Sequence, residues 1–175
     1  PKKERDLDMQ TERPKFTKVT LYNDPSNMFS FWYPPEWHVE EMDTPHRTLM
    51  LLPDPQDPAT HFMIEVKDLH APLAEDEHEV ILKSVRESID QLEKSAIERW
   101  QELEGNGRWG LEWILTFNVT GQRRKRRARL LFNDRFQYAI FFQGSSQERY
   151  EYWQGMFEFV LLTFQARDFD LAGWF

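Results

Sequence analysis

The sequence predicts an α+β domain built on an antiparallel sheet. Its strand-like segments follow one another through short turns instead of alternating with helices, which is typical of antiparallel sheets. Only two long segments have helical periodicity. The length of 175 residues fits a single domain. We therefore expect about eight strands and two main helices around one core.

The first part of the chain has the period-two pattern of strands. Residues 16–22 and 27–33 are predicted to form a hairpin around the turn at 23–26, and Pro34-Pro35 ends it because proline cannot donate to a ladder. Further short strands are expected at 37–42 and 48–52. In the next strand, at residues 61–69, the alternation points Phe62, Ile64 and Val66 toward the core.

The period changes near residue 75, where an acidic stretch begins a predicted helix that extends to residues 91–94. Its buried stripe consists of Ile81, Val85, Ser88, Ile89 and Leu92. Residues 96–104 fit both a helix and a strand. We predict a strand, because a hairpin follows after the turn at Gly105-Asn106-Gly107.

Residues 111–120 and 123–132 are predicted to form a hairpin around a two-residue type II′ turn at Gly121-Gln122. In this register Asn118 opposes Lys125 and Thr116 opposes Arg127. One face turns toward the core, with Trp113, Leu115, Phe117, Leu130 and Phe132. The other face, with Thr116, Asn118, Lys125 and Arg127, points outward. Arg124 and Arg126 share the apolar face, so the tip is expected to project beyond the core into water.

After the turn at 133–134, a strand at 135–143 is expected to place Phe136, Tyr138, Ile140 and Phe142 on one face. A second helix, at 145–164, begins with a capping box of Ser145 and Glu148. Its core stripe consists of Tyr150, Trp153, Phe157, Val160 and Phe164.

The predicted domain spans residues 16–167, between a polar N-terminal tail at 1–15 and a C-terminal tail at 168–175. The apolar residues of the C-terminal tail, Leu171, Trp174 and Phe175, are expected to pack back on the domain.

The net charge of −8 argues against a nucleic-acid partner, because nucleic-acid binders usually carry a basic face. The absence of cysteine excludes disulfides, thiolate catalysis and cysteine-bound metals. No apolar run is long enough for a transmembrane helix. A start at Pro1 suggests a mature product or a fragment. The compartment therefore stays open between the cytoplasm and an exported or tethered location, and the oligomeric state stays open too.

The motif Phe29-x-Phe31-x-Tyr33-Pro34-Pro35-x-Trp37 resembles an F-x-Y-P-x-x-W opening. A single helix, an antiparallel meander around residues 113–120, and a Gly144-Ser145-Ser146 step before an aromatic helix follow in order. Together they are similar to the PsbP-like family over residues 16–165. That family includes the PsbP subunit of photosystem II, a Ran-binding Mog-type import factor and bacterial DcrB-like lipoproteins.

The resemblance implies an α/β/α sandwich with a central antiparallel sheet. It implies little about activity, because none of these members is a well-established enzyme and they act as accessory or assembly proteins through their surfaces. We therefore expect an accessory or interaction domain with no cofactor and no enzymatic activity. The chain differs from the photosystem members because it shows no plant-type targeting segment.

The sequence contains no nucleophile motif, phosphate loop or metal-spaced histidine pair. A second interpretation is a domain that binds a metal or small ligand, with hydrolytic activity. Its weak candidate ligands are Asp54, Asp57, His61 and His70, together with the acidic helix start at 75–79. A solvated helix start and a proline-rich loop explain these residues equally well.

Six cations within seven positions are the strongest candidate binding site: Arg123, Arg124, Lys125, Arg126, Arg127 and Arg129. They fit an acidic protein partner or an anionic membrane surface. They also fit a charged edge that prevents strand-to-strand association. A peptide groove along Tyr33, Pro34 and Trp37 is a further candidate, although we favour the interpretation that Trp37 anchors the sheet as part of the core.

Overall fold

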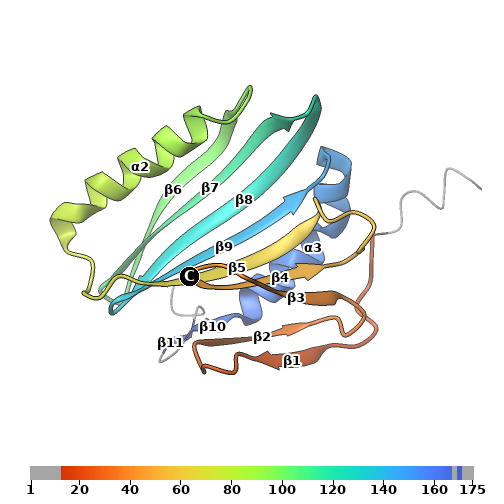
Figure 1. Ribbon diagram of the computed structural model, residues 1–175, viewed down its shortest axis with the longest axis horizontal. Helices are drawn as coiled ribbons and strands as arrows, with labels where there is room; N and C mark the ends of the chain where they lie inside the picture. The colour runs from red at the N-terminus through yellow and green to blue at the C-terminus, as the bar shows by residue number, and fades with distance from the viewer. Residues whose placement is uncertain (1–12, 167–168, 171–175) are drawn as a thin grey trace, which may run out of the picture.

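The computed structural model describes residues 13–166 and 169–170, which form two antiparallel sheets and two helices (Figure 1). The larger sheet has seven strands in the order β3-β4-β5-β9-β8-β7-β6, and the smaller has four in the order β1-β2-β10-β11. The strands are β1 Thr20–Asn23, β2 Phe29–Tyr33, β3 His38–Met42, β4 Arg47–Leu52, β5 His61–Asp68, β6 Ala96–Gly105, β7 Arg108–Val119, β8 Gln122–Asn133, β9 Phe136–Gly144, β10 Gln165–Ala166 and β11 Phe169–Asp170. The helical elements are η1 Glu75–Glu77, α2 His78–Asp90 and α3 Gln147–Thr163.

The two helices cover opposite faces of the large sheet. Alternate residues of β9 divide between two separate apolar clusters: Tyr138, Ile140 and Phe142 join the cluster under α3, whereas Ala139 and Phe141 face α2. The small sheet lies on the α3 side, and α2 lies across the other face nearest β6 and β7 (Figure 1). The predicted α+β class and α/β/α layering are confirmed.

The core under α3 is the larger of the two. The Phe157 ring is completely buried, with its centroid 5.5 Å from that of Trp37 and 5.4 Å from that of Phe142. The predicted aromatic stripe of this helix is therefore core, with Trp153 only partly buried. Gly144 allows the start of the helix to approach β9, since a Cβ at this position would lie 2.2 Å from a backbone nitrogen of the helix.

The α3 N-cap differs from the prediction by one residue. The hydroxyl of Ser146, not that of Ser145, accepts the Arg149 backbone N–H at 3.1 Å. Ser145 donates instead to the Asp57 carboxylate at 2.9 Å, so its side chain is not available to cap the helix.

The other core, between α2 and the sheet, consists mainly of sheet residues. Ile89 is the only buried residue of α2, whereas Trp109, Trp113, Leu115 and Phe117 of β7 are all buried. The ambiguous segment at 96–104 is strand β6, as predicted. This helix therefore lies over an apolar sheet face that it fills incompletely.

The predicted hairpin at the start of the domain is confirmed as β1–β2 of the small sheet, but the sequence did not predict the strands that extend it. Residues Gln165–Ala166 follow α3 and pair with Ser30 and Phe29 of β2. Most of the predicted N-terminal tail, residues 1–12, lies outside the described residues. Of the predicted C-terminal tail only 169–170 are described, and Leu171, Trp174 and Phe175 also lie outside.

The predicted register of the β7–β8 hairpin is wrong by two residues. The turn consists of Thr120 and Gly121, both with positive φ (48° and 82°), which is the type I′ geometry that matches strand twist. Thr116 therefore opposes Lys125, and Glu112 opposes Arg129. In the predicted register Glu112 would have opposed a leucine, so the observed register supplies a buried carboxylate with its counterion.

A shift of two residues leaves each side chain on its predicted face, and the five predicted core residues of the hairpin are buried. The prediction that the opposite face points outward is wrong. Helix α3 lies over part of that face, so Thr116 is buried and the side chains of Lys125 and Arg127 are only 16% and 13% exposed. The prediction of a projecting tip with both faces in water is also wrong for most of the basic run. Arg123 is exposed, but the cations from Arg124 to Arg127 are half-buried.

Candidate functional site

The six cations of β8 divide into two groups according to the face they occupy. On the α3 side, Arg127 and Arg129 pair with the buried carboxylate of Glu112. An Arg127 guanidinium nitrogen lies 2.9 Å from that carboxylate, and Nε of Arg129 donates to the same oxygen. Arg127 also contacts Glu158 of α3 at 3.2 Å. These two arginines are therefore committed to the interior of the protein.

The other two cations on this side also have internal partners. Lys125 Nζ lies 2.7 Å from the carboxylate of Glu98 on β6. Arg123 donates to the backbone carbonyl of Lys94 at 2.6 Å and to the hydroxyl of Thr116. Four of the six predicted partner-binding cations thus hold neighbouring strands and a loop together.

Arg124 and Arg126 point to the α2 side, and neither lies within ion-pair distance of a carboxylate among the described residues. Arg126 donates through Nε and Nη2 to the amide oxygen of Gln143, at 2.9 and 2.6 Å. The guanidinium also lies over the Phe117 ring, 4.8 Å from its centroid. Gln143 is held in turn by a bond from its amide nitrogen to the Ala59 carbonyl at 2.8 Å.

The positive charge of this corner has no carboxylate partner among the described residues, and it affects the titration of its neighbours. Burial lowers the pKa of Arg126, and the nearby charge of Arg124 lowers it further. Burial also lowers the pKa of His61 on β5, the strand beyond β9, and repulsion from both arginines adds to the effect. We call Arg124, Arg126 and His61 the cationic corner. In a protein with a net charge of −8, its two arginines are half-buried cations without a counterion among the described residues, and the lowered pKa of His61 favours the neutral imidazole.

An apolar row lies next to the cationic corner on the same face. Phe141 pairs with Met63, which pairs in turn with Met50, so the three side chains lie side by side across β9, β5 and β4. All three are only half-buried, because α2 lies nearest β6 and β7 (Figure 1). We call the cationic corner and this row together the open face.

The apolar row was not predicted, although the alternation of the sequence contains a signal for it. Met63 is one of the outward-facing residues of the predicted strand at 61–69, and Phe141 lies opposite the predicted core residues of the strand at 135–143. The alternation alone does not identify which part of this sheet face a helix leaves uncovered.

The predicted groove along Tyr33, Pro34 and Trp37 is part of the core. Trp37 is buried and packs edge-on against Trp153, with ring centroids 6.0 Å apart. Pro34 is also buried, and Tyr33 contacts the Phe31 ring.

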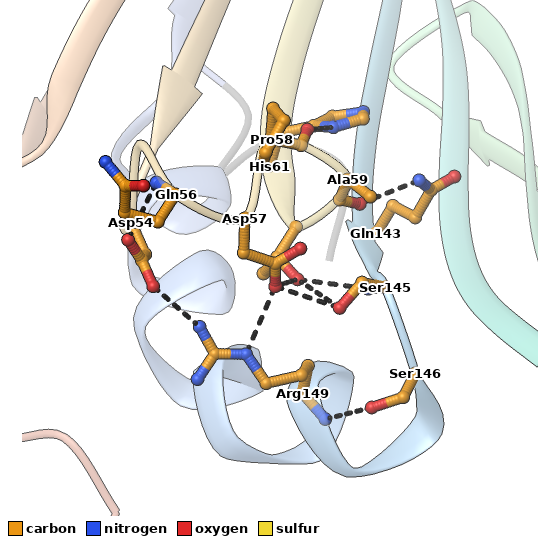
Figure 2. A network of polar contacts seen from close by, with 11 residues as sticks. Asp54, Gln56, Asp57, Pro58, Ala59, His61, Gln143, Ser145, Ser146 and Arg149 are labelled. Atoms are coloured by element: carbon orange, nitrogen blue, oxygen red, sulfur yellow. Dashed lines mark hydrogen bonds and ion pairs between the residues drawn. The ribbon is translucent and has the colours of Figure 1, made fainter. Parts of the chain in front are cut away.

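The weak metal candidates are occupied by other contacts. Figure 2 shows Asp54 and Asp57 turned toward Arg149 of α3, at 3.6 and 3.2 Å. Although burial raises the pKa of Asp57, hydrogen bonds from Thr60, Ser145 and Arg149 lower it below its usual value. The network therefore fastens the loop before β5 to the start of α3, and its carboxylates already have a cationic partner.

The two histidine candidates do not join this network into a metal site. His61 Nδ1 lies 2.9 Å from the Pro58 carbonyl oxygen (Figure 2), and the His70 side chain is exposed beside Asp68. Among the described residues, no three side chains of the metal-binding types are grouped. The acidic helix start lies at the other end of the sheet, beside an open hollow of about 700 Å³ where His78 stacks on Trp109.

The sequence matches no protein-family model and no curated protein. Solved structures with a similar fold include the following three. Cyanobacterial PsbP (CyanoP) of Synechocystis has a TM-score of 0.62 at 13% identity, with 87% of this chain and 94% of that one covered. LpqN of Mycobacterium tuberculosis, involved in cell envelope biogenesis, has a TM-score of 0.57 at 10% identity, with 86% of this chain and 91% of that one covered. The Ran-binding protein Mog1p of Saccharomyces cerevisiae has a TM-score of 0.54 at 7% identity, with 90% of this chain and 99% of that one covered.

These similarities confirm the PsbP-like fold that the resemblance implied, and at such low identity they establish the fold alone. Within the described part of the chain, no helix combines the length and apolar character needed to cross a bilayer.

Proposed function

We propose that this chain is a non-enzymatic interaction domain that binds an acidic segment of a protein partner on its open face. The observation that carries the proposal is the pair Arg124 and Arg126, which has no carboxylate partner among the described residues although four neighbouring cations are bound internally. One structural relative is named for binding another protein, Ran, which supports a protein as the partner class.

The open face has both features that a peptide of this kind requires. Carboxylates at the cationic corner would replace water around guanidinium groups that are already partly desolvated, and each hydrogen bond to a charged group contributes about 1.5–3 kcal/mol. The row of Met50, Met63 and Phe141 would hold apolar side chains two residues further along the strands. Methionine suits such a surface because its flexible thioether adapts to different side chains.

The polar network at Asp57 supports a non-enzymatic role. Ser145 donates a hydrogen bond from its hydroxyl group to the carboxylate of Asp57. The surrounding donors lower the pKa of this carboxylate, so it is a weak base. Arg149 occupies the position next to Asp57 where a catalytic histidine would be needed. The network therefore suits the attachment of a loop better than the activation of a nucleophile.

The proposal is tested with a fluorescein-labelled peptide of alternating Glu and Leu, measured by fluorescence anisotropy. We expect the double variant Arg124→Gln, Arg126→Gln to bind at least tenfold more weakly than the unchanged protein. The matched control, Lys18→Gln with Lys83→Gln, removes two exposed cations elsewhere and should change affinity less than twofold. Raising the salt concentration from 0.05 to 0.5 M should weaken binding, because screening shortens the range of the attraction.

Two outcomes would contradict the proposal. Equal affinity of the double variant and the control would exclude the cationic corner. Binding of phosphatidylserine-containing vesicles through Arg124 and Arg126, with no binding of the acidic peptide, would show that the partner is a membrane surface and not a protein.

A further inference from the structure

A crevice of about 360 Å³ lies between α2 and the large sheet, beside the open face. Its walls are mainly apolar and include Val85, Ile89 and Leu92 from the helix and Leu115, Ala139 and Phe141 from the sheet. The volume is near the lower end of the range for small-molecule sites, which is roughly 300–1,000 Å³. The crevice is therefore large enough for a short hydrocarbon chain and too small for a peptide segment.

One end of the crevice carries a cation without a counterion. Arg126 lines the crevice, whereas Arg124 does not. Among the described residues, the hydrogen-bond partner of Arg126 is the neutral amide of Gln143, which fixes its orientation through two bonds to one oxygen. Apolar atoms lie beside the guanidinium, including the rings of Phe117 and Phe141, so only neutral groups of the described protein offset its desolvation.

The one carboxylate in the crevice lies at the opposite end. Glu65 is in the cross-strand row of Ala139 and Leu130, and Leu130 is four residues beyond Arg126 on β8. At about 3.3 Å per residue, this places the two rows roughly 13 Å apart along the strands. An anion next to Arg126 would thus be remote from Glu65, and the apolar walls fill the interval.

The helix wall can adapt to an occupant. Ile89 is the only buried residue of α2, and the polar Ser84 and Ser88 line the mouth of the crevice. Three further apolar side chains of the helix, Ile81, Leu82 and Val85, are only partly buried against the sheet, so we expect a small shift of α2 to cost less than that of a fully packed helix.

We propose that this crevice binds a small amphiphilic carboxylate, whose head group pairs with Arg126 and whose short hydrocarbon chain lies between α2 and strands β7–β9. The ion pair supplies the counterion that Arg126 lacks, and the chain occupies space that α2 leaves unfilled. This ligand is additional to the acidic protein segment proposed above. Both use Arg126, but only the protein segment also requires Arg124.

Octanoate is the probe, with octanol and octylamine as neutral and cationic counterparts of equal chain length. Binding is measured by calorimetry and by amide chemical shifts. We expect octanoate to bind at least tenfold more tightly than octanol, with shifts at Ile89, Leu92 and Ala139, and octylamine to bind most weakly. Arg126→Gln should weaken octanoate binding at least tenfold, whereas Arg124→Gln should change it less than twofold.

A second variant, Ser88→Phe, tests the crevice without altering the charge. Ser88 is exposed at the mouth, so a larger side chain can fold over the opening and should block octanoate while leaving binding of the Glu-Leu peptide unchanged. Equal affinities for octanoate and octanol, no binding of octanoate, or unchanged binding by Arg126→Gln would each overturn the inference. Loss of peptide binding in Arg124→Gln with octanoate binding retained would leave the crevice intact and separate the two sites.

Discussion

Replacing Glu112 by glutamine should destabilise this protein strongly, although the side chain keeps almost the same volume. Its carboxylate is almost completely buried and faces three arginines: Arg127 at 2.9 Å, Arg99 at 3.7 Å, and Arg129 through a short hydrogen bond. Arg127 and Arg129 are themselves only 13% and 5% exposed at the side chain. Glu112→Gln keeps the shape but leaves two buried cations without their shared counterion.

Removing one partner of a buried ion pair typically costs about 3–5 kcal/mol, because the other charge stays desolvated and unpaired. We expect Glu112→Gln to lose this amount in the free energy of unfolding, measured by urea denaturation at pH 7. For a domain of this size the loss corresponds to about 2–4 °C in Tm for each kcal/mol. The control Glu87→Gln removes an exposed i,i+4 contact with Lys83 and should cost less than about 0.5 kcal/mol.

The stability difference between Glu112→Gln and the unchanged protein should depend on pH. Although burial raises the pKa of Glu112, Arg129 and Arg127 more than offset it and hold the pKa below the usual value. A depressed folded-state pKa stabilises the protein fully above the unfolded value of about 4.3, and the contribution is lost as pH falls through the folded value. The difference between Glu112→Gln and the unchanged protein should therefore shrink below pH 4. A loss under 1 kcal/mol at pH 7, or a difference independent of pH, would refute the reasoning.

Three further predictions concern the cores and the cationic corner. Phe157→Ala should cost about 3–5 kcal/mol, because its ring is completely buried; an unchanged Tm would contradict this. Gly144→Ala should destabilise by about 1–3 kcal/mol, because its Cβ would clash with the α3 backbone. The control Gly155→Ala meets nothing within 4 Å and should stabilise α3 by up to about 1 kcal/mol, so equal effects at both glycines would exclude the close approach. Arg126→Gln should raise the pKa of His61 in an NMR titration, because a repelling charge is removed; no change would mean that the two side chains are not close.

The elements were predictable because period and turn chemistry act locally. The strand at His61–Asp68 and the aromatic stripe of α3 follow from side-chain spacing alone, and both are buried as expected. The hairpin register was not predictable in this way, because Gly121 can occupy the first position of one turn type or the second of another. The choice is made by a contact distant in sequence, between Glu112 and Arg129.

Strand β10 of the small sheet was missed for a similar reason. Residues Gln165–Ala166 are too few to show alternation, and they form a strand only because the end of α3 delivers them to the edge of β2. Local propensity carries no signal for an arrangement of this kind, which depends on where a helix ends in space.

The basic run shows how far a composition signal can be taken. In the sequence it is one patch of six cations, but a strand sends alternate residues to opposite faces. Of the odd-numbered cations, Lys125, Arg127 and Arg129 pair with Glu98, Glu112 or Glu158, and Arg123 donates to the Lys94 carbonyl. Of the even-numbered pair, Arg126 contacts the Phe117 ring and the amide of Gln143, and neither arginine has a carboxylate partner among the described residues.

Solubility would be a sufficient explanation for six exposed cations on one strand. It does not explain two half-buried cations that lack a carboxylate partner among the described residues, because desolvation of a cation is unfavourable without a counterion. Under the proposals above, an anion that pairs with Arg126, from a protein side chain or a small carboxylate, would recover free energy that the burial of this cation costs in the unbound protein. We therefore infer that binding occurs on the face where Arg124 and Arg126 lie. The Arg124 and Arg126 variants test this inference directly, because they measure the loss of affinity for an anionic ligand.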